Sequence, residues 1–191
     1  MRCLSLHQPW ATFVVEGTKT IETRSWPTKH RGQLVICSTR TPWRGAWTFE
    51  MISVLSDGPK GIVRLGSYPD GFELGYALGV VNVVGCVPTE HVHPAEGPSY
   101  EATGFTGEDE ETGDGGWCWS EPGGELREYV AVTEREAGLG DFEDGRWAWL
   151  LTKGRRFKKP VAVRGHRRIW TPTWIEHTLI QDEINALRTA A

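Results

Sequence analysis

The chain has 191 residues, of which 39% are hydrophobic and 24% charged, and its formal net charge is −4. A chain of this length can bury a sizeable core without disulfide staples, and its balanced composition excludes wholesale disorder. No apolar run approaches the length of a membrane span, and the N-terminus lacks the charged region and apolar core of a secretion signal, so we expect a cytoplasmic protein without a membrane segment.

The cysteines and histidines do not form a metal-binding pattern. Cys3, Cys37, Cys86 and Cys118 are scattered and form no C-x-x-C pair, which predicts reduced, mostly buried thiols. The pair in His91-Val92-His93 has no carboxylate at metal-ligand spacing, and no glycine-rich loop resembles a phosphate cradle. We therefore expect no metal and no cofactor.

The N-terminal segment predicts a strand, a helix and two further strands. Leu4-Ser5-Leu6 alternates apolar and polar residues, as in a half-buried strand. Pro9 suits the first turn of a helix, and Gly17 stands where a left-handed residue would end it. The β-branched residues between Lys19 and Arg24 favour a strand, and Gln33–Cys37 reads as the next one.

Further elements follow along the chain. Leu78–Val87 is a near-continuous apolar strand that we place centrally in a sheet, and Trp147–Leu151 and Val161–Val163 read as two more buried strands. Residues 49–55 can form a short helix. Apolar residues at helical spacing predict a C-terminal amphipathic helix over Ile175–Leu187, with Ile175, Leu179, Ile180, Ile184 and Leu187 on its apolar face. Several short strands with few helices favour a small barrel over a doubly wound sheet.

Charge is distributed unevenly along the chain. Residues 94–127 are rich in Gly, Glu, Asp and Pro, and we expect a single domain over residues 1–191 with an acidic, Gly-rich surface insertion at about 94–140. Residues 153–168 contain only basic charges: Lys153, Arg155, Arg156, Lys158, Lys159, Arg164, Arg167 and Arg168. Such a local field can attract a polyanion although the whole chain is acidic. A weaker alternative is a protein-interaction module that uses the acidic insertion.

Three blocks of the sequence resemble a known family. They are "LSLHQPWA…GTKTIETRSWPTKHRGQLVI" at the N-terminus, "LGYALGVVNVVGCV" at 74–87 and "GRWAWLLTKGRRFKKPVAVRGHRRIW" at 145–170, and together they resemble an ASCH domain of the PUA-like superfamily. The most specific signal is the G-x-K-x-x-E-x-R-x-W pattern of Gly17, Lys19, Glu22, Arg24 and Trp26. The resemblance implies an α+β fold, a small PUA-like β-barrel with peripheral helices. It also implies RNA or DNA binding, and a few members of the family hydrolyse nucleosides or RNA.

From the residues and the resemblance together we expect a monomer that binds RNA or DNA, including a modified base or nucleotide, in a basic cleft with aromatic base contacts. The expected phosphate contacts are Lys19, Arg24 and Arg31. The expected base or sugar contacts are His7, Gln8, Trp10 and Trp26. The expected opposing wall of the cleft is Arg164, His166, Arg167 and Arg168. The sequence leaves open whether the ligand is RNA or DNA, and whether it is single-stranded or duplex.

The alternative is a hydrolase that acts on RNA or on a modified nucleoside of the N4-acylcytidine type. One ASCH-like branch is similar to an amidohydrolase with a Lys, a Thr three residues later and a downstream Glu. Lys19 fits the Lys, but Glu22 occupies the Thr position, so the hydroxyl nucleophile is missing. Lys19 and Glu22 could still form a catalytic acid–base pair. We favour the interpretation that Glu22 neutralises and positions Lys19 or Arg24, and hence a binding protein rather than an enzyme.

Overall fold

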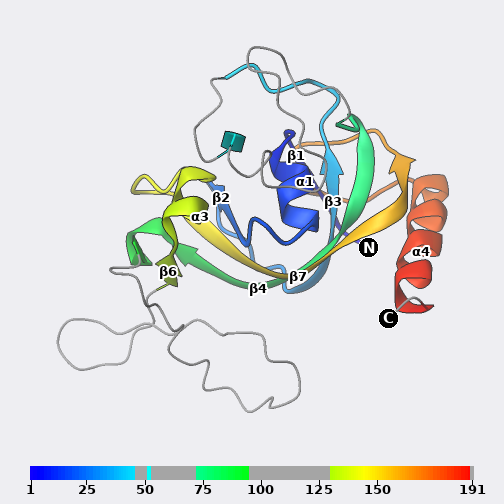
Figure 1. The fold of residues 1–191 in the computed structure, drawn as a ribbon. Coiled ribbons are helices and arrows are strands. Elements are labelled where there is room, and N and C mark those ends of the chain that lie inside the picture. Colours follow the sequence, from blue (N-terminus) through cyan, green and yellow to red (C-terminus); the bar gives the residue numbers. More distant parts are fainter. Residues whose placement is uncertain (46–50, 53–71, 95–129, 190–191) are drawn as a thin grey trace. The chain divides into compact units, whose positions relative to one another are not determined.

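The computed structural model describes residues 1–45, 51–52, 72–94 and 130–189 (Figure 1). The elements, in chain order, are β1 (Cys3–Leu6), α1 (Trp10–Val15), β2 (Ile21–Arg24), β3 (Gly32–Ser38), β4 (Tyr76–Pro88), the 3-10 helix η1 (Thr89–His91), β5 (Val92–Pro94), β6 (Val130–Val132), α3 (Glu134–Gly138), β7 (Trp147–Ala162), β8 (Ile169–Trp170) and α4 (Trp174–Thr189).

Most of the strands belong to one mixed sheet with the order β2-β7-β4-β3-β1-β8. β1 and β3 are parallel, with Leu6 opposite Ser38, and the chain between them contains α1 and β2. β8 pairs with β1 in the antiparallel direction, as β4 does with β3 and β2 with β7. β5 and β6 form a separate parallel pair. Because β1 and β3 run in the same direction, the residues that follow both strands emerge at the same edge of the sheet.

Residue contacts divide the chain into two compact units. The first unit comprises Met1–Thr20, His30–Val84 and Leu151–Ala191, and the second comprises Ile21–Lys29 and Gly85–Leu150. Strands β4 and β7 contribute residues to both units.

The core of the first unit lies between the sheet and α4. Ile180 and Ile184 of α4 are fully buried and pack in one cluster with residues of β1, β3, β4 and β7. Helix α1 packs against β7, and Gly154 permits this approach, because a Cβ atom there would lie 2.6 Å from the carbonyl oxygen of Val14. The left-handed Gly17, with φ at +76°, follows the end of α1 as the sequence predicts.

The core of the second unit is a smaller apolar cluster of Ile21, Val87, Val130, Val132, Ala148 and Leu150. Helix α3 contributes the buried Glu136 carboxylate, which accepts a hydrogen bond from the backbone amide of Ile21 (3.2 Å). The edge strand β2 is thereby tied to the helix.

Most of the predicted elements are confirmed. The α+β class, the N-terminal strand and helix, the two strands that follow and the interior position of β4 all match the structure. Of the helix predicted at residues 49–55, only Met51 and Ile52, both helical, fall within the described residues. Most of the expected insertion also lies outside them, although residues 130–138 hold β6 and α3. Within the described parts, no helix is long and apolar enough to cross a membrane.

Two predictions are wrong in detail. Trp147–Leu151 and Val161–Val163 are not separate strands, since β7 is continuous from Trp147 to Ala162. The intervening basic residues break the apolar pattern but not the backbone pairing. On α4, Ile180 and Ile184 are buried as expected, whereas Ile175 and Leu179 are 65% and 49% exposed.

Candidate nucleic-acid interface

A chain of backbone hydrogen bonds joins four segments at one edge of the first unit. The carbonyl of Leu6, at the end of β1, accepts from the amide of Thr39 (2.8 Å), just beyond β3. The carbonyl of Thr39 accepts from Gly75 (3.2 Å), just before β4, and the carbonyl of Gly75 accepts from Val163 (2.9 Å), just after β7. Side chains that follow these strand ends are therefore held close together.

Cationic and histidine side chains are concentrated at this edge. We call the edge the basic corner and define it by the exposed side chains of His7, Arg40, Arg164, His166, Arg167 and Arg168. Arg40 lies over Gly75, where a Cβ atom would be 2.7 Å from the Arg40 Cγ. Within the described residues, the side chains of Arg164 and Arg167 form no ion pair.

The loop of residues 164–168 is fixed against β1. Gly165 approaches Ser5 so closely that a Cβ atom would lie 2.8 Å from the Ser5 hydroxyl. The same hydroxyl accepts a hydrogen bond from the indole N–H of Trp170 (3.1 Å), and the His166 ring lies 5.2 Å from the Trp170 ring. Arg168 adopts a left-handed φ of 59°, which is uncommon for a residue with a side chain and marks a tight turn before β8.

Glu176 connects this loop to the first turn of α4. Its Oε1 accepts from the backbone amide of Arg164 (2.8 Å), and its Oε2 accepts from the amide and the hydroxyl of Thr173 (2.8 Å each). The Glu176 amide in turn faces the Thr173 hydroxyl (3.4 Å), which completes a capping box. Partial burial alone raises the pKa of Glu176, but the hydrogen bonds from Arg164 and Thr173 and the nearby His166 outweigh it and hold the pKa below its usual value.

The contacts of His7, which follows β1 directly, define its tautomer. Its Nδ1 lies 3.2 Å from the carbonyl oxygen of Thr41 and 2.9 Å from the Thr39 hydroxyl, which itself donates to the Thr41 carbonyl. A carbonyl can only accept, so Nδ1 carries the proton, and Nε2 of the neutral ring is an acceptor. The ring also lies 5.9 Å from Trp43, which packs edge-on against Trp10 (5.0 Å).

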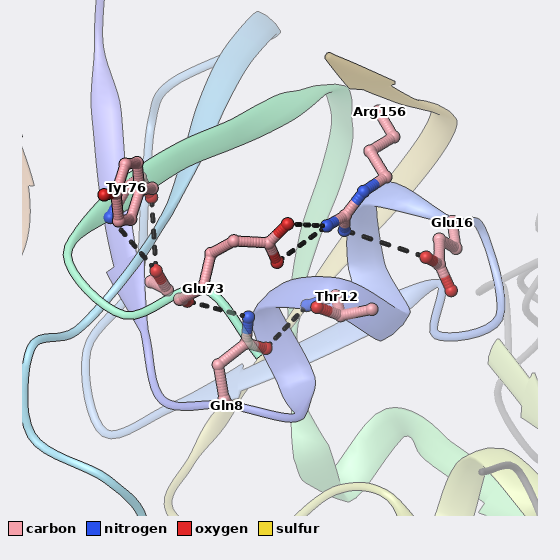
Figure 2. Close-up of polar contacts among 7 residues, drawn as sticks. Gln8, Thr12, Glu16, Glu73, Tyr76 and Arg156 are labelled. Carbon is pink, nitrogen blue, oxygen red and sulfur yellow. Dashed lines mark hydrogen bonds and ion pairs between the residues drawn. The ribbon is translucent and has the colours of Figure 1, made fainter. Parts of the chain in front are cut away.

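The next residue, Gln8, belongs to a network of polar contacts within the protein (Figure 2). The Gln8 amide donates to the carbonyl of Glu73 (3.2 Å) and accepts from the amide of Thr12 (3.1 Å). The Glu73 carboxylate binds Arg156 through both oxygens (2.9 and 2.8 Å), and Glu16 approaches the same guanidinium at 3.7 Å. Gln8 is fully buried and its amide positions the start of α1, while Arg156 is neutralised by two carboxylates.

Two of the three expected phosphate contacts, Lys19 and Arg31, belong to the first unit, and neither is part of the basic corner. The Lys19 side chain is only 1% exposed, so the protein interior surrounds it. Arg31 is exposed and donates to the carbonyl of His30 (2.9 Å), but it precedes β3, whereas Arg40 follows that strand. Arg31 and the basic corner therefore lie at opposite ends of β3.

The remaining expected site residues belong to the second unit. Glu22 and Arg24 form an ion pair (3.0 Å), so Arg24 is one of the two partners that the sequence assigned to Glu22. Trp26 is half-buried and packs edge-on against the buried Trp149 (4.7 Å), whose indole N–H donates to the Trp26 carbonyl (3.3 Å). Here the aromatic ring has a packing role within the second unit.

Sequence reasoning overlooked Arg40 and Trp43. Both follow the strand predicted at Gln33–Cys37, and a parallel pairing of this strand with Leu4–Leu6 would have placed them beside His7. The parallel pairing of β1 and β3, and not a local motif, was therefore the feature that could have predicted the position of these two residues.

The sequence matches a family model. The model, described as the ASCH domain, covers residues 4–121, which is more than half of the chain. The chain belongs to the ASCH domain family. The family assignment expected from the G-x-K-x-x-E-x-R-x-W pattern is thereby confirmed.

Individual relatives resemble only parts of this ASCH protein or resemble it weakly. Activating signal cointegrator 1 of Mus musculus and of Homo sapiens are each 60% identical to it over 37 residues, which is 19% of this chain. The chain spans only 6% of the length of these relatives. The crystal structure of a mutant of ZmASCH from Zymomonas mobilis matches 95% of this chain and 96% of its own at 13% identity, with a TM-score of 0.45.

Proposed function

We propose that this ASCH protein binds RNA or DNA through the basic corner. The observation that carries the proposal is the loop of residues 164–168, which presents three arginines and a histidine to solvent from a rigidly anchored backbone. Exposed arginines are suited to phosphates, because the guanidinium fork matches two phosphate oxygens. Membership in a family associated with nucleic-acid binding supports the same function.

The rest of the corner offers groups that can recognise a sugar or a base. The Nε2 atom of neutral His7 can accept a hydrogen bond from an exocyclic amine or a 2′-hydroxyl, and the exposed ring of Tyr76 lies one residue beyond Gly75. Phosphate contacts supply most of the affinity in such an interface, and contacts to bases supply selectivity.

The hydrolase alternative depends on Lys19 and Glu22. Glu22 is ion-paired with Arg24, and the pairing favours a structural role for the carboxylate. The binding function is therefore the one that we carry forward.

Fluorescence anisotropy with labelled single-stranded RNA, single-stranded DNA and duplex DNA across a salt series tests the proposal. Arg167→Gln removes one exposed charge, so we expect weaker binding to every sequence and a salt slope smaller by about 0.7 on a single strand or about 0.9 on duplex DNA. Lys158→Gln is the matched control, because Lys158 is an exposed cation of the same unit on β7 and lies outside the basic corner.

Two results would contradict the proposal. One is the absence of binding to all three oligomers at low salt. The other is an equal loss of affinity in Arg167→Gln and Lys158→Gln, which would show that the charge of the whole chain, rather than the basic corner, governs the interaction.

A further inference from the structure

Helix α4 begins with an aromatic side chain that the fold does not bury. Trp174 is 80% exposed, and Ile175 beside it is 65% exposed. The helix is anchored through its opposite face, where Ile180 and Ile184 are fully buried. Trp174 is therefore dispensable for docking the helix, and large exposed apolar side chains that adjoin one another are typical of interaction sites.

The first turn of α4 lies next to the basic corner. The Glu176 carboxylate bridges the backbone amides of Arg164 and Thr173, at 2.8 Å from each. Trp174 directly follows Thr173. The Glu176 side chain therefore links the backbone next to the exposed indole to the loop of residues 164–168. From Arg164 to Ile175 the sequence contains no acidic residue.

We propose that the Trp174 indole is a stacking platform for an unpaired base of a single-stranded nucleic acid whose phosphates contact the basic corner. The inference rests on the function proposed above and adds a ligand class, single strand, and a residue that the sequence did not indicate. A cationic track with an aromatic face at its end is the arrangement by which proteins hold single strands without reading their sequence.

Charge complementarity identifies the occupant of this surface. On the N-terminal side of the indole, residues 164–173 carry only basic or neutral side chains, which suits a polyanion. The carboxylate of Glu176, two residues after Trp174, is engaged by the backbone amides of Arg164 and Thr173. Asp182 and Glu183 lie two turns further along α4 and oppose a polyanion there. The strand therefore leaves the helix after its first turn, and Trp174 accepts a single base.

An abasic scan combined with substitution tests the inference. A fluorescent single-stranded oligomer and a set of copies, each lacking one base, are bound to the wild type, Trp174→Ala, Trp174→Phe and Leu179→Ala. We expect Trp174→Ala to weaken binding of the intact oligomer about five-fold or more, with an unchanged salt slope. Trp174→Phe should restore most of the affinity, because it keeps an aromatic face. Leu179→Ala, a 49% exposed position on the same helix, should have no effect.

The scan locates the stacked base. At one abasic position the wild type should lose as much affinity as Trp174→Ala does, and the two losses should not add. Trp174→Ala should leave duplex binding unchanged, because bases in a duplex are already stacked.

The outcomes separate this inference from the proposed function. If the wild type binds no oligomer, the proposed function itself fails. If the wild type binds, Arg167→Gln weakens binding and Trp174→Ala does not, the stacking role alone is overturned. The same conclusion follows if Trp174→Ala weakens duplex binding equally, or if sedimentation shows a dimer that this substitution dissociates, since α4 would then be a protein interface.

Discussion

The substitution Glu176→Gln distinguishes two opposite effects of one carboxylate on nucleic-acid binding. As a negative charge near Arg164, Glu176 repels phosphates, so its removal should strengthen binding. As an acceptor for the Arg164 amide, it fixes the basic loop against α4, so its removal should weaken binding. We expect the second effect to dominate.

The size of each effect follows from general magnitudes and from the contacts of Glu176. For a phosphate taken to lie about 8 Å away, removing one charge gains about 0.5 kcal/mol in water, or about two-fold in affinity, and salt reduces this gain further. Glu176 accepts three hydrogen bonds of 2.8 Å, with the Arg164 and Thr173 backbone amides on different oxygens. A glutamine side chain has a single acceptor oxygen, so the variant cannot accept from both amides. Losing charge-assisted bonds and part of the cap at this largely exposed site costs about 1 kcal/mol of stability. A loosened loop should then reduce affinity about three- to ten-fold.

Anisotropy titration with a single-stranded oligomer measures the sign of the change directly. Glu183→Gln is the matched control, because Glu183 lies on the same helix and its carboxylate also accepts a strand amide, that of Lys159 (3.1 Å), outside the basic corner. It should leave affinity nearly unchanged. Tighter binding by Glu176→Gln would refute a positioning role and leave only the electrostatic one.

The same carboxylate predicts a pH dependence of stability. The pKa of Glu176 is lower in the folded protein than its ordinary value of 4.5, so its stabilising contribution is complete above that pH and is lost as the pH falls through the folded-state pKa. The glutamine of Glu176→Gln does not titrate, so the free energy of unfolding of this variant should fall less at acid pH than that of the wild type. Identical pH profiles for the two proteins would show that the hydrogen bonds at this carboxylate do not contribute to folding.

Two further predictions concern buried side chains. Lys19→Ala should lower the melting temperature and leave the salt slope of binding unchanged, because a side chain that is 1% exposed does not reach a surface phosphate; a slope smaller by about 0.7 would show that it does. Hydrogen bonding to Cys3 and burial raise the pKa of Cys37, so in a variant with Cys86 and Cys118 replaced by serine neither remaining thiol should react with Ellman's reagent until the protein is unfolded. Rapid labelling of the native protein would contradict this.

Local patterns in the sequence predicted the elements well, because each pattern reflects a rule that acts over a few residues. The alternation at Leu4–Leu6 and the glycine at position 17 correctly predicted β1 and the end of α1. The strand expected between Lys19 and Arg24 is present as β2, and Glu22 and Arg24, two residues apart on it, form one of the two pairings expected for Glu22.

The site could be predicted only in part, because its assembly depends on contacts between distant segments. The basic residues at 164–168 are exposed as expected, but the hydrogen bonds that bring them to His7 and Arg40 run through Thr39 and Gly75, which carry no local signal. The burial of Gln8 and Lys19 was equally invisible to a one-dimensional pattern, since polar residues near a strand end are usually exposed.

The basic run at residues 153–168 shows why a count of charges does not predict an electrostatic surface. Within this run, Arg156 faces Glu73 and Glu16, so its charge is neutralised by residues far away in the sequence. Arg164 and Arg167 have no such partner among the described residues, and they follow β7 instead of lying within it. Of these three arginines, the two in the loop therefore offer their charge to a ligand, and the one in the strand does not. Neutralising Arg156 by substitution should accordingly disturb folding more than binding, whereas neutralising Arg167 should do the reverse.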